Sequence, residues 1–160
     1  MHLLRGNVSH DQSEGEAVDL GQTPGDLVII SAADTELAAL AAARDGLSAE
    51  DAACSSLRLA NMMALRHPYS VDLYAQDIWA HAKTIVLRVL GGLGYWRYGV
   101  EQAQEVAKAS GARLIVLPGD AKPDPELMAY STAEAEQVQQ VWDYFNQGGP
   151  DNMRHLLLAL

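Results

Sequence analysis

Cysteine is almost absent from this chain of 160 residues, since Cys54 is the only one. A single thiol cannot form an internal disulfide, and it cannot supply the several thiolates of a structural zinc site. A secreted domain held together by disulfides is therefore excluded. The composition fits the reducing cytoplasm, where we expect the protein to be.

Basic residues are also scarce: 11 Lys and Arg stand against 21 Asp and Glu, for a net charge of −10. This balance argues against nucleic acid and against an anionic membrane surface as partners, because both require a basic face. No apolar run approaches the ~20 residues of a membrane span. The segment Met1–Gly6 is too short for a signal peptide, and polar residues follow it.

Sequence motifs for common reactions are missing. Gly94 and Gly99 have the glycine spacing of a phosphate-binding loop, but Val100 and Glu101 follow where lysine and a hydroxyl residue are needed. There is no G-x-S-x-G for a serine nucleophile and no H-E-x-x-H for zinc. The five histidines show no metal-ligand spacing. We therefore expect no nucleotide, metal or other cofactor to be bound by this domain alone, and we assign no catalytic residue.

Apolar runs alternate with amphipathic helical stretches along the chain. The predicted internal strands are Leu27–Ser31, Leu57–Asn61, Thr84–Leu90 and Arg113–Leu117, and Met1–Arg5 is a candidate edge strand. Strands that alternate with helices predict a parallel sheet covered on both faces. We expect residues 1–160 to form a single α/β domain, a three-layer flavodoxin- or Rossmann-like fold with a mainly parallel sheet of about four to five strands.

Capping residues predict where several helices begin. The predicted caps are Asp34 for a helix that ends at Gly46, Ser48 for a short turn through Ala53, Ser70 for a helix with an apolar stripe from Val71 to Ala82, and Ser131 with Glu134 for a helix that reaches Phe145. Pro150 is expected in the first turn of the last helix.

The most informative segment is the turn after the third strand. Thr84–Leu90 stops at Gly91-Gly92, and Tyr95 and Trp96 then open a helix that runs to about Ser110. Glycines at a strand end permit a positive φ or the close approach of another group. The turn is either structural, with both aromatic rings packed on the core, or part of a binding site at the sheet edge. We expect Tyr95 to be partly exposed and Trp96 to be packed beneath it.

Several other polar residues are predicted at strand ends, where open α/β sheets bind ligands. The candidate ligand-binding residues are Asp34, Asn61, His67, Gly91, Gly92, Tyr95, Trp96 and Asp120. Each has a structural alternative: Asp34 as a helix cap, Asn61 and His67 as turn residues, and Asp120 as a brace for the proline-rich loop Pro118–Pro125.

The segments with these residues resemble, in order, the amino-terminal region of the CobN family. The matching stretches are Asp19–Gln22, Pro24–Asp26, Ser31–Leu37, Leu57–Asn61, Leu65–Asp72, the turn Arg88–Glu101, Leu117–Asp120, Pro123–Pro125 and Phe145–Met153. CobN is the large subunit of the aerobic, ATP-dependent cobaltochelatase and is related to the large subunits of magnesium chelatases. Family members are much longer, so the chain resembles the first domain of such a subunit.

This resemblance implies a role in inserting cobalt into hydrogenobyrinic acid a,c-diamide during cobalamin biosynthesis. It implies separate AAA+-type partner subunits that hydrolyse ATP, so that cobalt and ATP are used by the whole complex. The chain alone is then expected to be inactive. The corrin substrate is large, flat and partly apolar, and exposed aromatic rings would suit it. Two alternatives are a stand-alone tetrapyrrole-binding module and a docking domain without catalysis.

Overall fold

A parallel sheet of four strands organises the domain. The computed structural model describes residues 16–47 and 56–160, and its strands are β1 (Leu27–Ser31), β2 (Leu57–Asn61), β3 (Thr84–Val89) and β4 (Arg113–Pro118). The strand order is β2-β1-β3-β4, and every pair is parallel. The predicted fold and its four adjacent strands are confirmed. The predictions for Met1–Arg5 and for the turn from Ser48 to Ala53 lie outside the described residues.

Helices follow each strand. The α-helices are α3 (Asp34–Asp45), α4 (Pro68–Asp77), α5 (Arg97–Ser110), α6 (Pro125–Met128), α7 (Ala135–Gln147) and α8 (Pro150–Ala159). Short 3-10 turns are η2 (Met62–Leu65), η3 (Trp79–His81) and η4 (Leu93–Tyr95). In the part of the chain described, each helix is too short or too polar to cross a lipid bilayer.

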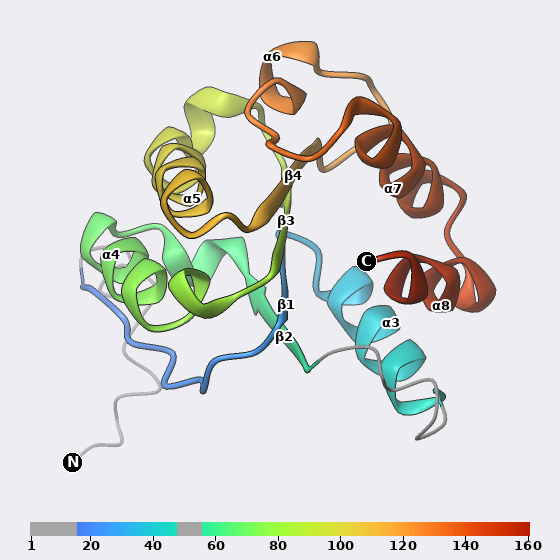
Figure 1. The fold of residues 1–160 in the computed structure, drawn as a ribbon, viewed down its shortest axis with the longest axis horizontal. Helices are drawn as coiled ribbons and strands as arrows, with labels where there is room; N and C mark the ends of the chain where they lie inside the picture. The colour runs from blue at the N-terminus through green and yellow to red at the C-terminus, as the bar shows by residue number, and fades with distance from the viewer. Residues whose placement is uncertain (1–15, 48–55) are drawn as a thin grey trace.

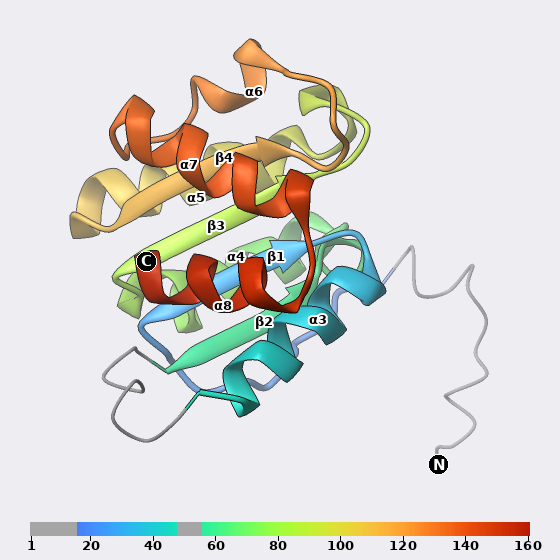
Figure 2. The same ribbon diagram turned by 90° about the vertical axis from the view of Figure 1, so that its right-hand side faces the viewer.

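The helices form a layer on each face of the sheet (Figures 1 and 2). Helices α4 and α5 cover one face, and α3, α7 and α8 cover the other. Successive residues of a strand point to opposite faces, so each strand contacts both helix layers. Ile85, Leu87 and Val89 pack towards the first pair, and Val86 packs towards the second group. Trp79 and Trp142 are buried, as their positions in the apolar stripes predicted.

Three predicted helix caps are wrong. Asp34 lies in the first turn of α3, and Ala33 takes the cap position. His67 rather than Ser70 caps α4, which ends at Asp77 before the 3-10 turn η3, so the predicted single helix is divided. Ser131 makes no cap, because its hydroxyl accepts a hydrogen bond from the Val116 amide of β4 (2.9 Å).

Side chains and loop backbone form hydrogen bonds along both edges of the sheet. On β4, the Leu114 amide donates to the Thr132 hydroxyl (2.8 Å), and the Thr132 amide donates back to the Leu114 carbonyl (2.8 Å). On β2, the Leu59 carbonyl accepts from the Gln22 side chain (2.8 Å). The Leu57 carbonyl accepts from the guanidinium of Arg58 (3.0 Å), which also binds the Thr23 carbonyl.

Candidate functional site

The carboxyl ends of the strands form one edge, and the candidate residues follow the strand ends in the sequence. Strand β2 lies on one side of β1 and β3 on the other, so the chain reverses its direction of travel across the sheet after β2. In open α/β sheets, ligands bind in the crevice at this point of reversal. The crevice would open between the ends of β1 and β3, at Ser31 and its register partner Arg88.

A largely buried ion pair lies at this position, with the Arg88 side chain 6% and the Glu36 side chain 18% exposed. The Arg88 guanidinium donates through Nε and Nη2 to both carboxylate oxygens of Glu36, at 3.1 and 2.9 Å. Its Nη1 donates to the Pro118 carbonyl (2.5 Å), and the Ser31 hydroxyl donates to the same carboxylate (2.8 Å). The guanidinium also lies over the Phe145 ring, 4.5 Å from its centroid. A two-pronged contact of this kind is strong and directional, so it fixes the ends of three strands to α3.

Sequence reasoning missed Arg88 and Glu36 as members of this edge. The signal for Arg88 was available, because it is one charged residue within the otherwise buried strand β3. A fully buried arginine requires partners, since an unpaired buried charge is costly. Glu36 carries no such signal, because an acidic residue in the first turn of a helix is usually exposed there.

The glycine turn after β3 has a positive φ, one of the two roles that the sequence left open for its glycines. Gly91 and Gly92 have φ values of +93° and +83°, which side chains rarely tolerate. A Cβ on Gly91 would lie 3.0 Å from Cγ of Tyr95, so the glycine also allows the tyrosine ring to lie against the turn. Tyr95 itself is 55% exposed, which confirms the expected exposure.

Trp96 belongs to the core rather than to an open site. Its side chain is 5% exposed, and its Nε1 donates to the Leu65 carbonyl (2.9 Å). The indole meets Trp79 edge to face, with centroids 6.3 Å apart. It lies across Gly99, where a Cβ would be 2.1 Å from Cε2 of the indole. The structural alternative for Trp96 therefore holds, and helix α5 begins one residue later, at Arg97.

The four polar candidates are engaged in hydrogen bonds within the domain. Asn61 Nδ2 donates to Oδ1 of Asp34 (2.7 Å), and Asn61 Oδ1 accepts from the Met63 amide (2.8 Å), so this pair joins the ends of β1 and β2. His67 Nδ1 accepts from the Tyr69 amide (3.1 Å). Asp120 accepts from the backbone amide two residues later (3.0 Å).

Two tyrosines have perturbed acidity. Burial raises the pKa of Tyr74, whose hydroxyl donates to Gln22 (2.6 Å). The pKa of Tyr98 is raised because its hydroxyl donates to the Asp72 carboxylate (2.6 Å). Across the two described ranges, no three His, Cys, Asp or Glu side chains group as a metal would require. The carboxyl edge, as described, therefore combines an exposed tyrosine ring with polar side chains that are held in hydrogen bonds.

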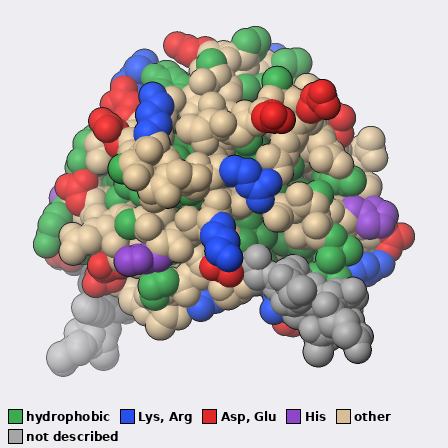
Figure 3. All heavy atoms as spheres, viewed as in Figure 1, with side chains coloured by type: hydrophobic (Ala, Val, Ile, Leu, Met, Phe, Trp, Pro, Cys, Tyr) green, Lys and Arg blue, Asp and Glu red, His purple; other side chains and the backbone are tan. Residues whose placement is uncertain are grey.

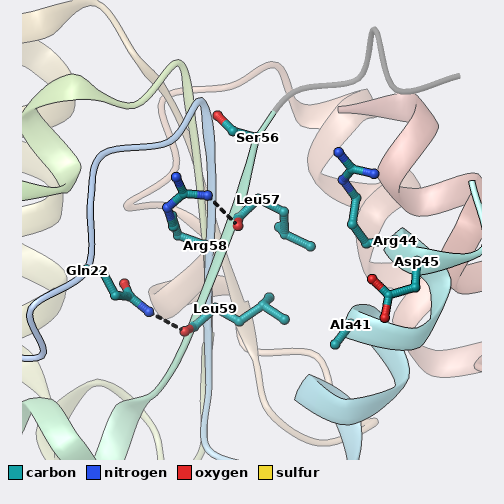
Figure 4. A pocket seen from close by; sticks show the side chains of 8 residues that line it. All are labelled: Gln22, Ala41, Arg44, Asp45, Ser56, Leu57, Arg58 and Leu59. Atoms are coloured by element: carbon teal, nitrogen blue, oxygen red, sulfur yellow. Dashed lines mark hydrogen bonds between the residues drawn. The ribbon is translucent and has the colours of Figure 1, made fainter. Parts of the chain in front are cut away.

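A separate groove follows the outer edge of β2, away from the candidate residues (Figure 4). Leu57 and Leu59 form its floor, and Arg44 and Asp45 of α3 stand on one side. None of the eight candidate residues lines it. The site predicted from the sequence and this groove are therefore different places.

Comparisons with known proteins agree on one family. No protein-family model matches the chain. The aerobic cobaltochelatase subunit CobN of Sinorhizobium sp. is 47% identical over 155 residues, which cover 95% of this chain and 12% of that protein. CobN of Pseudomonas aeruginosa is 46% identical over 152 residues, with the same two coverages.

A solved structure shows the same fold. The catalytic subunit of cobaltochelatase from Mycobacterium tuberculosis superposes with a TM-score of 0.64 and 27% identity, over 87% of this chain and 10% of that one. The chain spans about an eighth of the length of its curated relatives. The resemblance carried by the motifs is thereby confirmed: this chain is a homologue of one domain-sized segment of the CobN cobaltochelatase subunits.

Proposed function

We propose that this domain contributes to the ATP-dependent insertion of cobalt into hydrogenobyrinic acid a,c-diamide, in the cytoplasm, as a step of cobalamin biosynthesis. The observation that carries the proposal is the 47% identity to a CobN subunit over 95% of the chain. Identity of this extent over a whole domain supports a shared role in the same assembly.

Within that assembly we assign the domain a positioning role. Arg88, Asn61 and His67 at the carboxyl edge are held in hydrogen bonds within the domain, which supports a scaffold rather than a proton-transfer site. ATP hydrolysis is assigned to AAA+-type partner subunits. Cobalt and ATP are then substrates of the whole complex.

A segment exchange tests the proposal. The homologous segment of Pseudomonas aeruginosa CobN is replaced by this chain, and cobalt insertion is followed by the visible spectrum of the corrin in the presence of ATP and the partner subunits. We expect the chimera to retain activity within about tenfold of the parent, and a CobN that lacks the segment to be inactive. A chimera that folds and assembles but inserts no cobalt would contradict the proposed role.

Tetrapyrrole binding by the chain alone is the second candidate function, favoured by the exposed ring of Tyr95. Titration of a corrin with the isolated chain distinguishes the two. A saturable spectral change that Tyr95→Ala abolishes supports a stand-alone binding module, whereas an unchanged spectrum leaves the role in the larger subunit.

A further inference from the structure

Exposed apolar side chains gather at the carboxyl edge. Seven large apolar residues are exposed in the described part of the chain, and four of them follow the ends of β2 and β3. These four, Met63, Tyr69, Leu90 and Tyr95, are here called the apolar rim. Figure 3 shows the opposite, amino-terminal edge of the sheet, where hydrophobic, acidic and basic side chains are interspersed. Methionine and tyrosine are enriched at the centres of protein interfaces, so the rim has the composition of a contact surface.

The backbone beneath each rim residue is fixed. The Met63 amide donates to Asn61, and the Tyr69 amide donates to His67. A Cβ on Gly119 would lie 3.1 Å from the Leu90 backbone, so the loops after β3 and β4 are closely packed. Side chains presented from a rigid backbone lose little conformational freedom on association, which favours binding. Asn61 and His67 thus hold the backbone at Met63 and Tyr69.

The rim is suited to a surface rather than to a small molecule. Arg88 and Glu36 lie at the position between the ends of β1 and β3, with two hydrogen bonds between them. The formal net charge of the chain is −10, which on its own disfavours an anionic ligand. A large protein surface with its own apolar patch fits these features better than an anionic ligand does.

From these observations we infer that the apolar rim docks against the remaining body of a cobaltochelatase large subunit. In the curated relatives the segment homologous to this chain is 12% of the protein, so a much larger body accompanies it. Domains within one chain commonly share interfaces of about 600–1,500 Å². Four large apolar side chains at one edge suffice for the centre of such a contact. This inference rests on the proposed function.

Hydrogen exchange in the chimera described above tests the inference. The amides of residues 62–69 and 90–96 are compared in the isolated chain and in the full-length chimera, first without corrin and without partner subunits. We expect these two segments to exchange at least about tenfold more slowly in the chimera, and amides on the outer face of α7 to exchange alike in both. Protection that appears only with corrin, only with the AAA+-type subunits, or already in concentrated isolated chain would overturn docking on the body.

A charge-introducing pair of substitutions gives the second measurement. Leu90→Arg with Tyr95→Arg should remove the protection in the chimera and speed its proteolysis at the domain junction, while the isolated variant keeps its thermal midpoint. Leu158→Arg is the matched control, because Leu158 is as exposed (51%) as Leu90 (48%) but lies on α8. Equal undocking by both variants refutes the inference.

The two hypotheses can fail separately. A chimera that is inactive but has a protected rim would refute the proposed function alone, and a chimera that is active but has an unprotected rim would refute the docking alone.

Discussion

Replacing Gly99 with alanine would place a methyl group inside the indole ring of Trp96. The added Cβ would lie 2.1 Å from Cε2, 2.4 Å from Cζ2 and 2.5 Å from Cδ2. These atoms are part of a rigid, buried ring, so a small side-chain rotation cannot relieve the overlap. The indole must leave its position over α5 for the variant to fold.

The expected cost follows from what the indole loses. Trp96 donates to the Leu65 carbonyl and contacts Trp79 edge to face, and these contacts contribute about 1 kcal/mol each. Loss of a whole buried aromatic side chain costs about 3–5 kcal/mol, which sets the upper limit. Alanine is favoured over glycine within a helix by about 1 kcal/mol, which offsets part of the loss. We therefore expect Gly99→Ala to lower the free energy of unfolding by about 2–3 kcal/mol.

Urea denaturation, followed by circular dichroism and tryptophan fluorescence, measures this change. Gly94→Ala is the matched control, because nothing lies within 4 Å of its added Cβ and its φ is not positive, so its stability should stay close to that of the parent. Combining Gly99→Ala with Trp96→Leu should cost less than the sum of the two single changes, since the smaller side chain removes the overlap. A Gly99→Ala variant at least as stable as the parent would refute the reasoning.

Two further predictions concern the buried polar groups. Arg88→Met should lower the free energy of unfolding by about 3 kcal/mol, because it leaves the Glu36 carboxylate without its charged partner, and Arg88→Met with Glu36→Leu should recover part of the loss in the same urea assay. Burial raises the pKa of Tyr74, so the folded state keeps that proton at pH values above 10 where the unfolded chain releases it, and stability falls as the pH rises. Tyr74→Phe should flatten this alkaline decline in thermal midpoint, and an equally steep decline in the variant would rule out Tyr74 as its source.

The strands, the end of α3 at Gly46 and the start of α8 at Pro150 could be predicted from the sequence, whereas three N-terminal helix caps could not. The strand Leu27–Ser31 is an apolar run bounded by a proline-glycine turn, and a short run of this kind is typical of a buried strand. The failed caps each have a distant partner instead: Asp34 binds Asn61, Ser70 accepts from the Val18 amide 52 residues away, and Ser131 binds β4. Capping patterns consider only hydrogen bonds between residues close in sequence. At these three positions the side chain instead forms a hydrogen bond with a residue far away in the sequence.

The candidate site shows the same division. The positive φ of the Gly91-Gly92 turn and the contrast between Tyr95 and Trp96 follow from local chemistry; the first was one of two roles left open by the sequence, and the second was predicted. The pairing of Arg88 with Glu36 joins residues 52 positions apart in sequence. It depends on the register of β1 against β3, which a single sequence does not specify. The ion pair at this position, and with it the preference for a docking surface, became visible only in the fold.

The hydrogen bonds at the two sheet edges affect how readily the domain pairs with other chains. An uncovered edge strand invites pairing with other chains, which leads to aggregation or exchange of strands. Here Thr132 occupies the edge at β4, and Gln22 and Arg58 occupy the edge at β2. These partners all come from within the domain itself. Bonds of this kind lower the tendency of each edge strand to pair with another chain, whether the domain stands alone or belongs to a larger protein.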